Sequence, residues 1–210
     1  MSLEARSELS KDAAHLELLE SMAIEMPEIE RHPNRVPFRG VLTLADAPSD
    51  KPPSGSRGHR VLLTGKAVEE AIPSLLGMAV DYTPSLDGHN ARAKIGVVTS
   101  AELETLPAIR VLEREGRALH LHGRVQQLNV GGYLYGKDFP EVVNEMRTKG
   151  KGELGMSYEI ADVHVADVEA AVWAVTKFTF TGAAVLLKNK AAYQRTWVEI
   201  TGREATAKAR

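Results

Sequence analysis

The stretch Gly152-Glu153-Leu154-Gly155-Met156-Ser157-Tyr158-Glu159-Ile160 alternates between two kinds of side chain. Apolar side chains stand at 154, 156, 158 and 160, and Gly155, Ser157 and Glu159 stand between them. Successive side chains of a β-strand point to opposite faces, so this pattern predicts a half-buried strand with a polar face. Ser157 then presents its hydroxyl beside a glycine that leaves room above the backbone. Most serines at such positions are only structural, so a catalytic role requires a partner elsewhere in the chain.

Further predicted strands and helices surround this stretch. Apolar runs predict strands at 36–44, 59–63, 78–82, 93–100, 118–125 and 171–187. Helical patterns lie at 10–30, 65–76, 102–115 and 138–149, the last with Pro140 in its first turn. The Pro/Ser/Gly-rich loop 46–58 is expected to be mobile, and 131–136 to be a flexible connection. Because strands predominate and few β-α-β units occur, we expect an α+β fold with a mainly antiparallel, barrel-like β core and surrounding helices.

The length of 210 residues suits one domain with appendages. Residues 1–34 are expected to form an amphipathic helical arm, 35–196 the α+β domain, and 197–210 a polar C-terminal tail. The apolar stripe of the arm can pack on its own domain or on a partner subunit. Both possibilities remain open from the sequence.

Composition excludes several classes of function. A net charge of -2 and a pI near 6.4 give no basic field for nucleic acid. The absence of cysteine excludes disulfides, thiolate metal sites and a cysteine nucleophile, and fits a cytosolic origin. The polar N-terminus does not look like a signal peptide, and the apolar runs are too short to span a bilayer. Nucleotide-binding, lipase-type and zincin motifs are missing, so no cofactor and no metal are expected.

His89 ends a turn-rich segment, 83–90, directly before a predicted strand. Serine catalysis needs a base within hydrogen-bonding reach of the hydroxyl and a third group that orients the base. His89 is therefore the candidate base for Ser157. A competing hypothesis is a zinc enzyme that uses His120, His122 and a third ligand such as His164.

Four blocks occur in a suggestive order. His89 is followed by Ile95-Gly96, then come the strand 119–125, the lead 151–157 into Ser157, and the closing strand 178–187 with 190–193 after it. This ordered set, over about residues 36–195, resembles the phage prohead (capsid-maturation) serine proteases, distant relatives of the herpesvirus assemblins.

The resemblance implies a barrel-like α+β fold and a serine endopeptidase with Ser157 as nucleophile and His89 as base. Backbone amides near Lys188, Asn189 and Lys190 would stabilise the oxyanion. The implied substrates are the scaffold protein or the scaffolding segment of the capsid protein, cleaved in the host cytoplasm inside the procapsid. The resemblance also implies a homodimer, and neither nucleic acid nor membrane is an expected partner.

One departure from the family concerns the third triad member. The family carries a histidine or carboxylate on the closing strand, roughly 25 residues after the serine, where this chain reads Phe180-Thr181-Gly182-Ala183-Ala184. Thr181 could orient His89 through its hydroxyl. A side chain from elsewhere could do so instead, the candidates being His120, His122, His164 and Glu159. As a third explanation, the chain is an impaired, protease-like assembly protein of the phage head.

Overall fold

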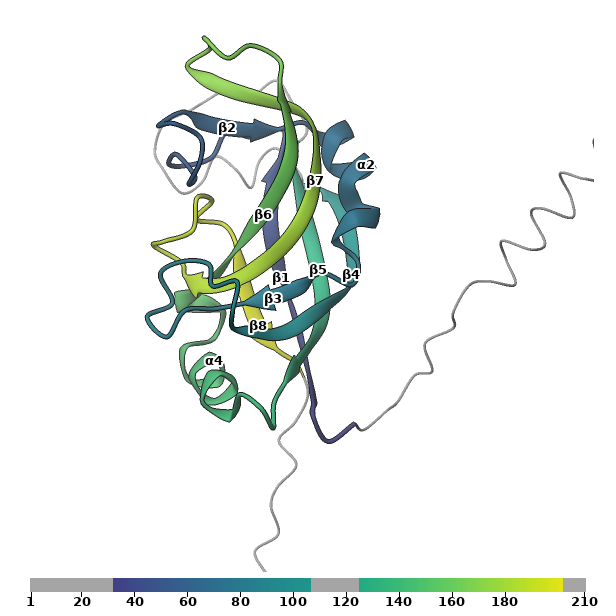
Figure 1. The fold of residues 1–210 in the computed structure, drawn as a ribbon, viewed down its shortest axis with the longest axis vertical. Helices are drawn as coiled ribbons and strands as arrows, with labels where there is room; N and C mark the ends of the chain where they lie inside the picture. The colour runs from purple at the N-terminus through teal and green to yellow at the C-terminus, as the bar shows by residue number, and fades with distance from the viewer. Residues whose placement is uncertain (1–31, 107–124, 202–210) are drawn as a thin grey trace, which may run out of the picture. The chain divides into compact units, whose positions relative to one another are not determined.

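The computed structural model describes residues 32–106 and 125–201. Within these ranges the chain is a mixed α+β protein whose eight strands form one curled sheet, with two helices against it (Figure 1). The strands are β1 Arg35–Ala45, β2 Arg60–Leu63, β3 Ala79–Asp81, β4 Lys94–Thr105, β5 Gln126–Tyr135, β6 Leu154–Val165, β7 Val172–Leu187 and β8 Trp197–Ile200. The helices are α2 Gly65–Leu75 and α4 Pro140–Glu153. The expected α+β class is confirmed.

The sheet is mixed and is organised on the long strand β7. Its order is β2-β7-β3-β4-β5-β1-β8, with β6 paired along the other edge of β7. Most pairs are antiparallel, but β2 and β3 run parallel to β7 near its two ends. The sheet curls until β6 meets β1, since a side chain at Gly40 would lie 2.9 Å from the sulfur of Met156. The expected mainly antiparallel arrangement therefore describes most of this sheet.

The expected apolar face of the central stretch points into the core. Leu154 and Met156 are almost completely buried, and Tyr158 and Ile160 pack against the same cluster while partly exposed. Burying a side chain such as Leu154 stabilises the fold by about 1.5–3 kcal/mol. The two-residue period of β6 thereby fixes which side chains remain for the opposite, polar face.

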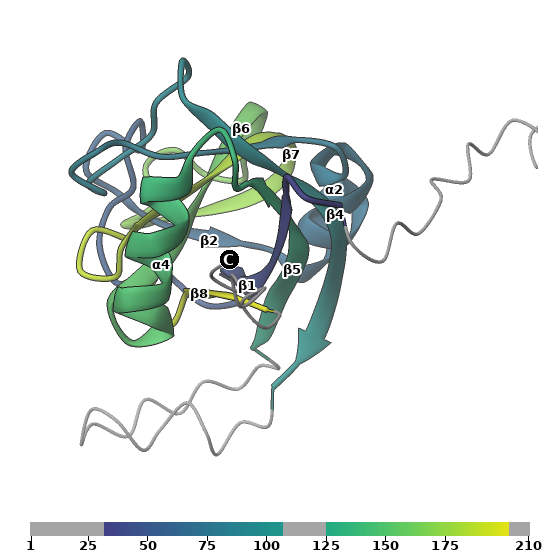
Figure 2. The same ribbon diagram turned by 90° about the horizontal axis from the view of Figure 1, so that it is seen from below.

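Helix α2 closes the gap that β2 and β3 leave along one edge of β7. The hydroxyl of the N-cap residue Thr64 accepts a hydrogen bond from the backbone N–H of Ala67. The backbone N–H of Thr64 donates to the carbonyl of Val175 in β7. Near the other end, the Ser74 hydroxyl accepts from the amide of Phe180, also on β7. Helix α4 lies well apart from α2, beside β8 (Figure 2), and packs into the same core. The apolar side expected for it, Val142, Val143 and Met146, is buried.

Two expectations for β4 and β5 are wrong. The helix expected from 102 is strand β4 as far as Thr105, and the rest of that prediction lies outside the described residues. Residues 131–136, expected to be flexible, belong mostly to β5, which pairs with both β4 and β1. Gly132 is needed there for close approach, because an added Cβ would lie 2.0 Å from the carbonyl oxygen of Val97.

The loop 46–58, which was expected to be mobile, is anchored to the domain at several points, and its tip at Ser54 and Gly55 is exposed. Ser49 is fully buried and its hydroxyl accepts from the amide of Val61. The Ser56 hydroxyl donates to the carbonyl of Pro53 and also lies 2.7 Å from the carbonyl of His59. Short polar side chains thus add to the backbone hydrogen bonds that tie this loop to β2 and to Ala192.

The domain boundaries also change. Residues Trp197–Ile200, expected in the tail, form β8 with a fully buried Val198, because even four alternating residues can extend a sheet. The chain divides between His32 and Pro33. The predicted helix 10–30 and all of the predicted strand 118–125 except Val125 lie outside the described residues. No helix in the described ranges has the length and apolar character needed to cross a membrane.

Candidate functional site

His89 lies in the loop that joins β3 to β4, and contacts fix this loop on both sides of it. Leu86 is buried although its φ of 51° is left-handed, and its carbonyl accepts a hydrogen bond of 2.7 Å from the Leu187 amide. That conformation costs a non-glycine residue about 1–2 kcal/mol, which the burial of the side chain offsets. On the other side, the Asn90 amide donates to Asp81 at 3.1 Å. The imidazole is thereby held over the end of the sheet.

Asp81 is the last residue of β3 and is fully buried. Its Oδ2 lies 3.0 Å from Nζ of Lys94, and its Oδ1 accepts a hydrogen bond from the backbone N–H of Asn90. Burial raises the pKa of the Asp81 carboxyl, but the neighbouring His89, Lys94 and Asn90 groups outweigh burial and leave the pKa below its ordinary value. Asp81 is therefore a charged carboxylate at neutral pH.

Glu159 reaches the same imidazole from β6. It lies opposite Gly182 of β7, and its Oε1 is 3.3 Å from Nδ1 of His89. An added Cβ at Gly182 would lie only 2.8 Å from the other oxygen, Oε2. The missing side chain at 182 therefore makes the space that the Glu159 carboxylate occupies. Glu159 is one of the alternatives left open by the sequence, and the structure brings it to His89.

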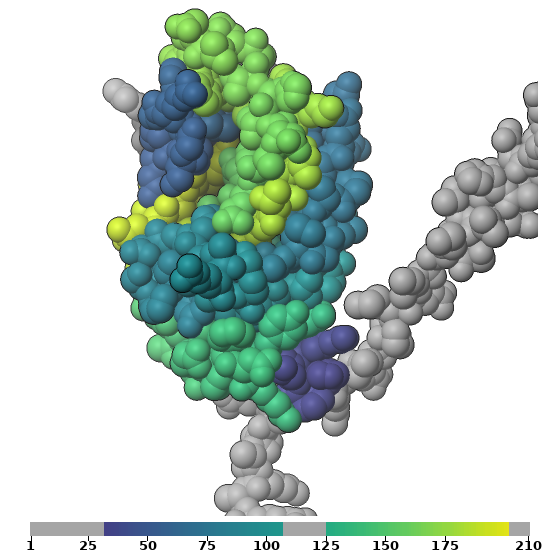
Figure 3. Space-filling view, viewed as in Figure 1, coloured from purple at the N-terminus to yellow at the C-terminus, as the bar shows by residue number. Residues whose placement is uncertain are grey.

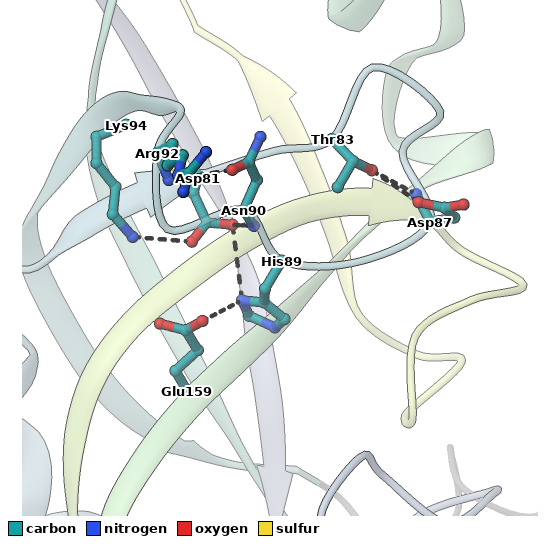
Figure 4. Close-up of polar contacts among 8 residues, drawn as sticks. All are labelled: Asp81, Thr83, Asp87, His89, Asn90, Arg92, Lys94 and Glu159. Atoms are coloured by element: carbon teal, nitrogen blue, oxygen red, sulfur yellow. Dashed lines mark hydrogen bonds and ion pairs between the residues drawn. The ribbon is translucent and has the colours of Figure 1, made fainter.

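Nδ1 of His89 faces both carboxylates (Figure 4). It lies 3.6 Å from Oδ1 of Asp81 as well as 3.3 Å from Glu159. The atom is buried, yet its geometry with the described residues satisfies no hydrogen bond. Two carboxylate oxygens therefore converge on one imidazole nitrogen at distances slightly longer than ordinary hydrogen bonds. Among the described residues, Asp81, His89 and Glu159 form the group whose spacing could hold a metal.

Ser157 shares a sheet face with both carboxylates. Asp81 and Ser157 are both in register with Ala184, on the two sides of β7. Neighbouring strands lie about 4.8 Å apart, so the Asp81 and Ser157 backbones are about 10 Å apart across this small residue. Ser157 and Glu159 point to one side of β6, about 7 Å apart along the strand. The hydroxyl thus belongs to the same face as the groups around His89.

The surface around the loop is open in one direction. Figure 3 shows the loop segment beneath β6, with a hollow between β6 and the segment that ends in β2. Ser157 itself is partly exposed.

The room expected above Gly155 is filled, which corrects the interpretation of that glycine. An added Cβ would lie 2.8 Å from Oγ1 of Thr196 and 3.3 Å from Cα of Lys188. The Thr196 hydroxyl also accepts from the amide of Met156 and donates to the carbonyl of Tyr193. Gly155 therefore allows the segment 188–196 to pack on β6 and leaves no space for a ligand there.

Two of the three expected oxyanion amides already have acceptors. The Lys188 amide donates to the carbonyl of Glu153 at 2.7 Å, and the Lys190 amide donates to that of Leu187 at 2.8 Å. The carbonyl of Asn189 accepts from Nζ of Lys51. The Lys190 bond closes the turn after β7 and the Lys188 bond ties that turn to the end of α4, so Lys188 and Lys190 are poor oxyanion donors in this arrangement.

The other expected site residues lie apart from the imidazole nitrogen described above. Thr181 is exposed, as the extra residue of a β-bulge between Phe180 and Gly182. His164 is exposed farther along β6, opposite Lys177. His120 and His122 lie outside the described residues. In the described ranges, the carboxylates at His89 come from Asp81 and Glu159.

Sequence reasoning missed Asp81 and Lys94. A signal was present, since Asp81 is an acidic residue inside the apolar run 78–82. A buried carboxylate is expected to be paired, and Lys94 is the first cationic residue of the next strand. Comparisons with protein-family models, with curated proteins and with solved structures found no match for this chain.

Proposed function

We propose that this chain is a serine endopeptidase of the phage prohead type, with Ser157 as nucleophile, His89 as base, and Glu159 and Asp81 as the groups that orient His89. The observation that carries the proposal is the pair of carboxylates at Nδ1 of His89. An imidazole held this way has Nε2 left to accept a proton, as serine catalysis requires. The curled α+β sheet is, in this proposal, the barrel-like core of that family.

The mechanism follows the usual order of acyl transfer. Nε2 of His89 accepts the proton as the Ser157 oxygen attacks the peptide carbonyl, and the leaving amine later receives it. The imidazolium formed between these steps is stabilised by Glu159 and Asp81. Glu159 takes the place of the acid missing from the closing strand, because it projects over Gly182, 25 residues after Ser157 (182 − 157 = 25).

The substrates in this proposal are the phage scaffold protein or the scaffolding segment of the capsid protein, cleaved within the procapsid in the host cytoplasm. The test is co-expression with the capsid and scaffold proteins of the same phage. Wild type and Ser54→Ala, a change at an exposed serine, should give shortened products. Ser157→Ala should leave both proteins intact. Uncleaved bands with all three variants would exclude proteolysis.

A second candidate is a protease-like assembly protein without activity. It is favoured by the amides of Lys188 and Lys190, which are already paired and so unavailable for an oxyanion. This alternative predicts that the capsid and scaffold proteins stay uncleaved and that mature particles contain a fixed number of copies of this chain. Reaction of Ser157 with a fluorophosphonate, which needs no known substrate, separates the two candidates: the enzyme reacts and the assembly protein does not.

A further inference from the structure

Three donor atoms from three parts of the chain converge beside His89. They are Nδ1 of His89, Oε1 of Glu159 and one carboxylate oxygen of Asp81, and all lie within 4.8 Å of one another. Zinc binds imidazole nitrogen and carboxylate oxygen at about 2.0–2.2 Å, so tetrahedral neighbours stand about 3.4 Å apart. The distances from Nδ1 to the two oxygens, 3.3 Å and 3.6 Å, match that spacing.

The surroundings already hold these donors in place. Asp81 is fully buried, with one oxygen at Lys94 and the other at the Asn90 amide. Such outer contacts orient metal ligands. Nδ1 of His89 is a buried nitrogen whose hydrogen-bonding capacity the described residues do not satisfy, and it points between the carboxylates. Nδ1 lies 3.3 Å from Glu159 and 3.6 Å from Asp81, so an imidazole nitrogen and two carboxylate oxygens from three separate parts of the chain converge on one point.

We infer that a divalent transition-metal ion of the zinc class binds to His89, Glu159 and Asp81 and switches off the serine site. The inhibitory half of this inference rests on the proposed function. A neutral imidazole that coordinates a metal through Nδ1 carries its proton on Nε2. Nε2 then has no lone pair to accept the proton of Ser157. Magnesium and calcium prefer all-oxygen sites, so the imidazole selects against them.

Binding is tested on the full chain after treatment with EDTA, by isothermal titration calorimetry with zinc chloride. Wild type, Ser157→Ala and Glu102→Gln, a change at an exposed carboxylate, should each bind one ion. Glu159→Gln should weaken binding at least tenfold, because it removes an anionic ligand. His89→Ala should abolish this binding, and magnesium chloride should give no heat of binding. Unchanged zinc affinity in His89→Ala and Glu159→Gln would overturn the inference.

The chain has other histidines that could bind zinc, so a second variant keeps the site assignment testable. His120→Ala/His122→Ala should retain the single zinc site of the wild type. Loss of that site in this variant, together with its retention in His89→Ala, would assign the metal elsewhere and overturn the inference.

Inhibition is measured separately as the rate at which a fluorophosphonate labels Ser157. Stoichiometric zinc should lower that rate at least tenfold, and EDTA should restore it. An unchanged or faster labelling rate with zinc would contradict the switch. If the metal-free protein is not labelled at all, the proposed function fails, while calorimetry still decides the metal site. The two failures are therefore distinguishable.

Discussion

Two turn-rich segments meet the C-terminal end of β7, and they differ in what they leave unpaired. In 188–196 the amides of Lys188 and Lys190 and the hydroxyl of Thr196 all have partners. In the loop 82–93 the backbone is also fixed, yet Nδ1 of His89 has only two long contacts, 3.3 Å to Glu159 and 3.6 Å to Asp81. The segment 188–196 therefore has the contacts of a structural clamp, whereas the His89 loop leaves an imidazole nitrogen facing two carboxylates.

The largest expected effect comes from the imidazole itself. In His89→Ala, labelling of Ser157 by a fluorophosphonate should fall by more than about 10⁴-fold, because the base is lost. Stopped-flow or gel-based labelling rates measure this. His164→Ala, at an exposed histidine of β6, is the matched control and should react like the wild type. Equal rates in both variants would place the base elsewhere.

Glu159→Gln tests the carboxylate that replaces the missing acid. The labelling rate should drop by about 10²–10⁴-fold, since an amide can fix the wrong tautomer and does not stabilise the imidazolium. Glu102→Gln serves as the control. A loss of less than threefold would show that Glu159 does not orient His89.

Gly182→Ala tests whether the space over β7 matters. The added methyl group would lie 2.8 Å from Oε2 of Glu159 and should displace that side chain, lowering the labelling rate about tenfold. Gly152→Ala, where an added Cβ meets nothing within 4 Å, should leave the rate unchanged. Circular dichroism melts of both variants check folding. Unaltered labelling in Gly182→Ala would count against the placement of Glu159.

Acid should weaken the fold through Asp81. Its folded pKa lies below the ordinary 3.8, so the stabilisation is fully present above pH 3.8 and is lost as the pH falls through the folded pKa. One such group changes the unfolding free energy by at most about 1.4 kcal/mol per pH unit. Urea melts between pH 2 and 6 should show a shallower acid slope in Asp81→Asn than in wild type. Identical slopes would refute this role.

The smallest effect is expected in the clamp. Lys190→Gln leaves the backbone bond from residue 190 to Leu187 in place, so labelling should change less than about twofold. A labelling rate at least tenfold lower would show that the segment 188–196 takes part in catalysis, which would contradict its assignment as a structural clamp.

The sequence predicted the fold better than the site. Alternation along 154–160 predicted that Ser157 and Glu159 lie on one face of the strand. The pairing of these residues with Ala184 and Gly182 of β7 confirms it. The alternation could not predict that Gly182 lies opposite Glu159, because register depends on contacts across the sheet. The glycines at 131–132 were interpreted as flexible, although close strand packing requires them. Lys188 and Lys190 were expected to be oxyanion donors from their position after the closing strand alone. The sequence does not show that their backbone amides already have acceptors.

In the proposed enzyme, Glu159 and Asp81 orient His89 toward Ser157. A crystal structure of the full chain after reaction with a fluorophosphonate tests it most directly. We predict a phosphonyl group on Ser157, with Nε2 of His89 within about 3.2 Å of an adduct oxygen and Nδ1 still between the carboxylates of Glu159 and Asp81. An unmodified Ser157, or an imidazole turned away from the adduct, would contradict the account.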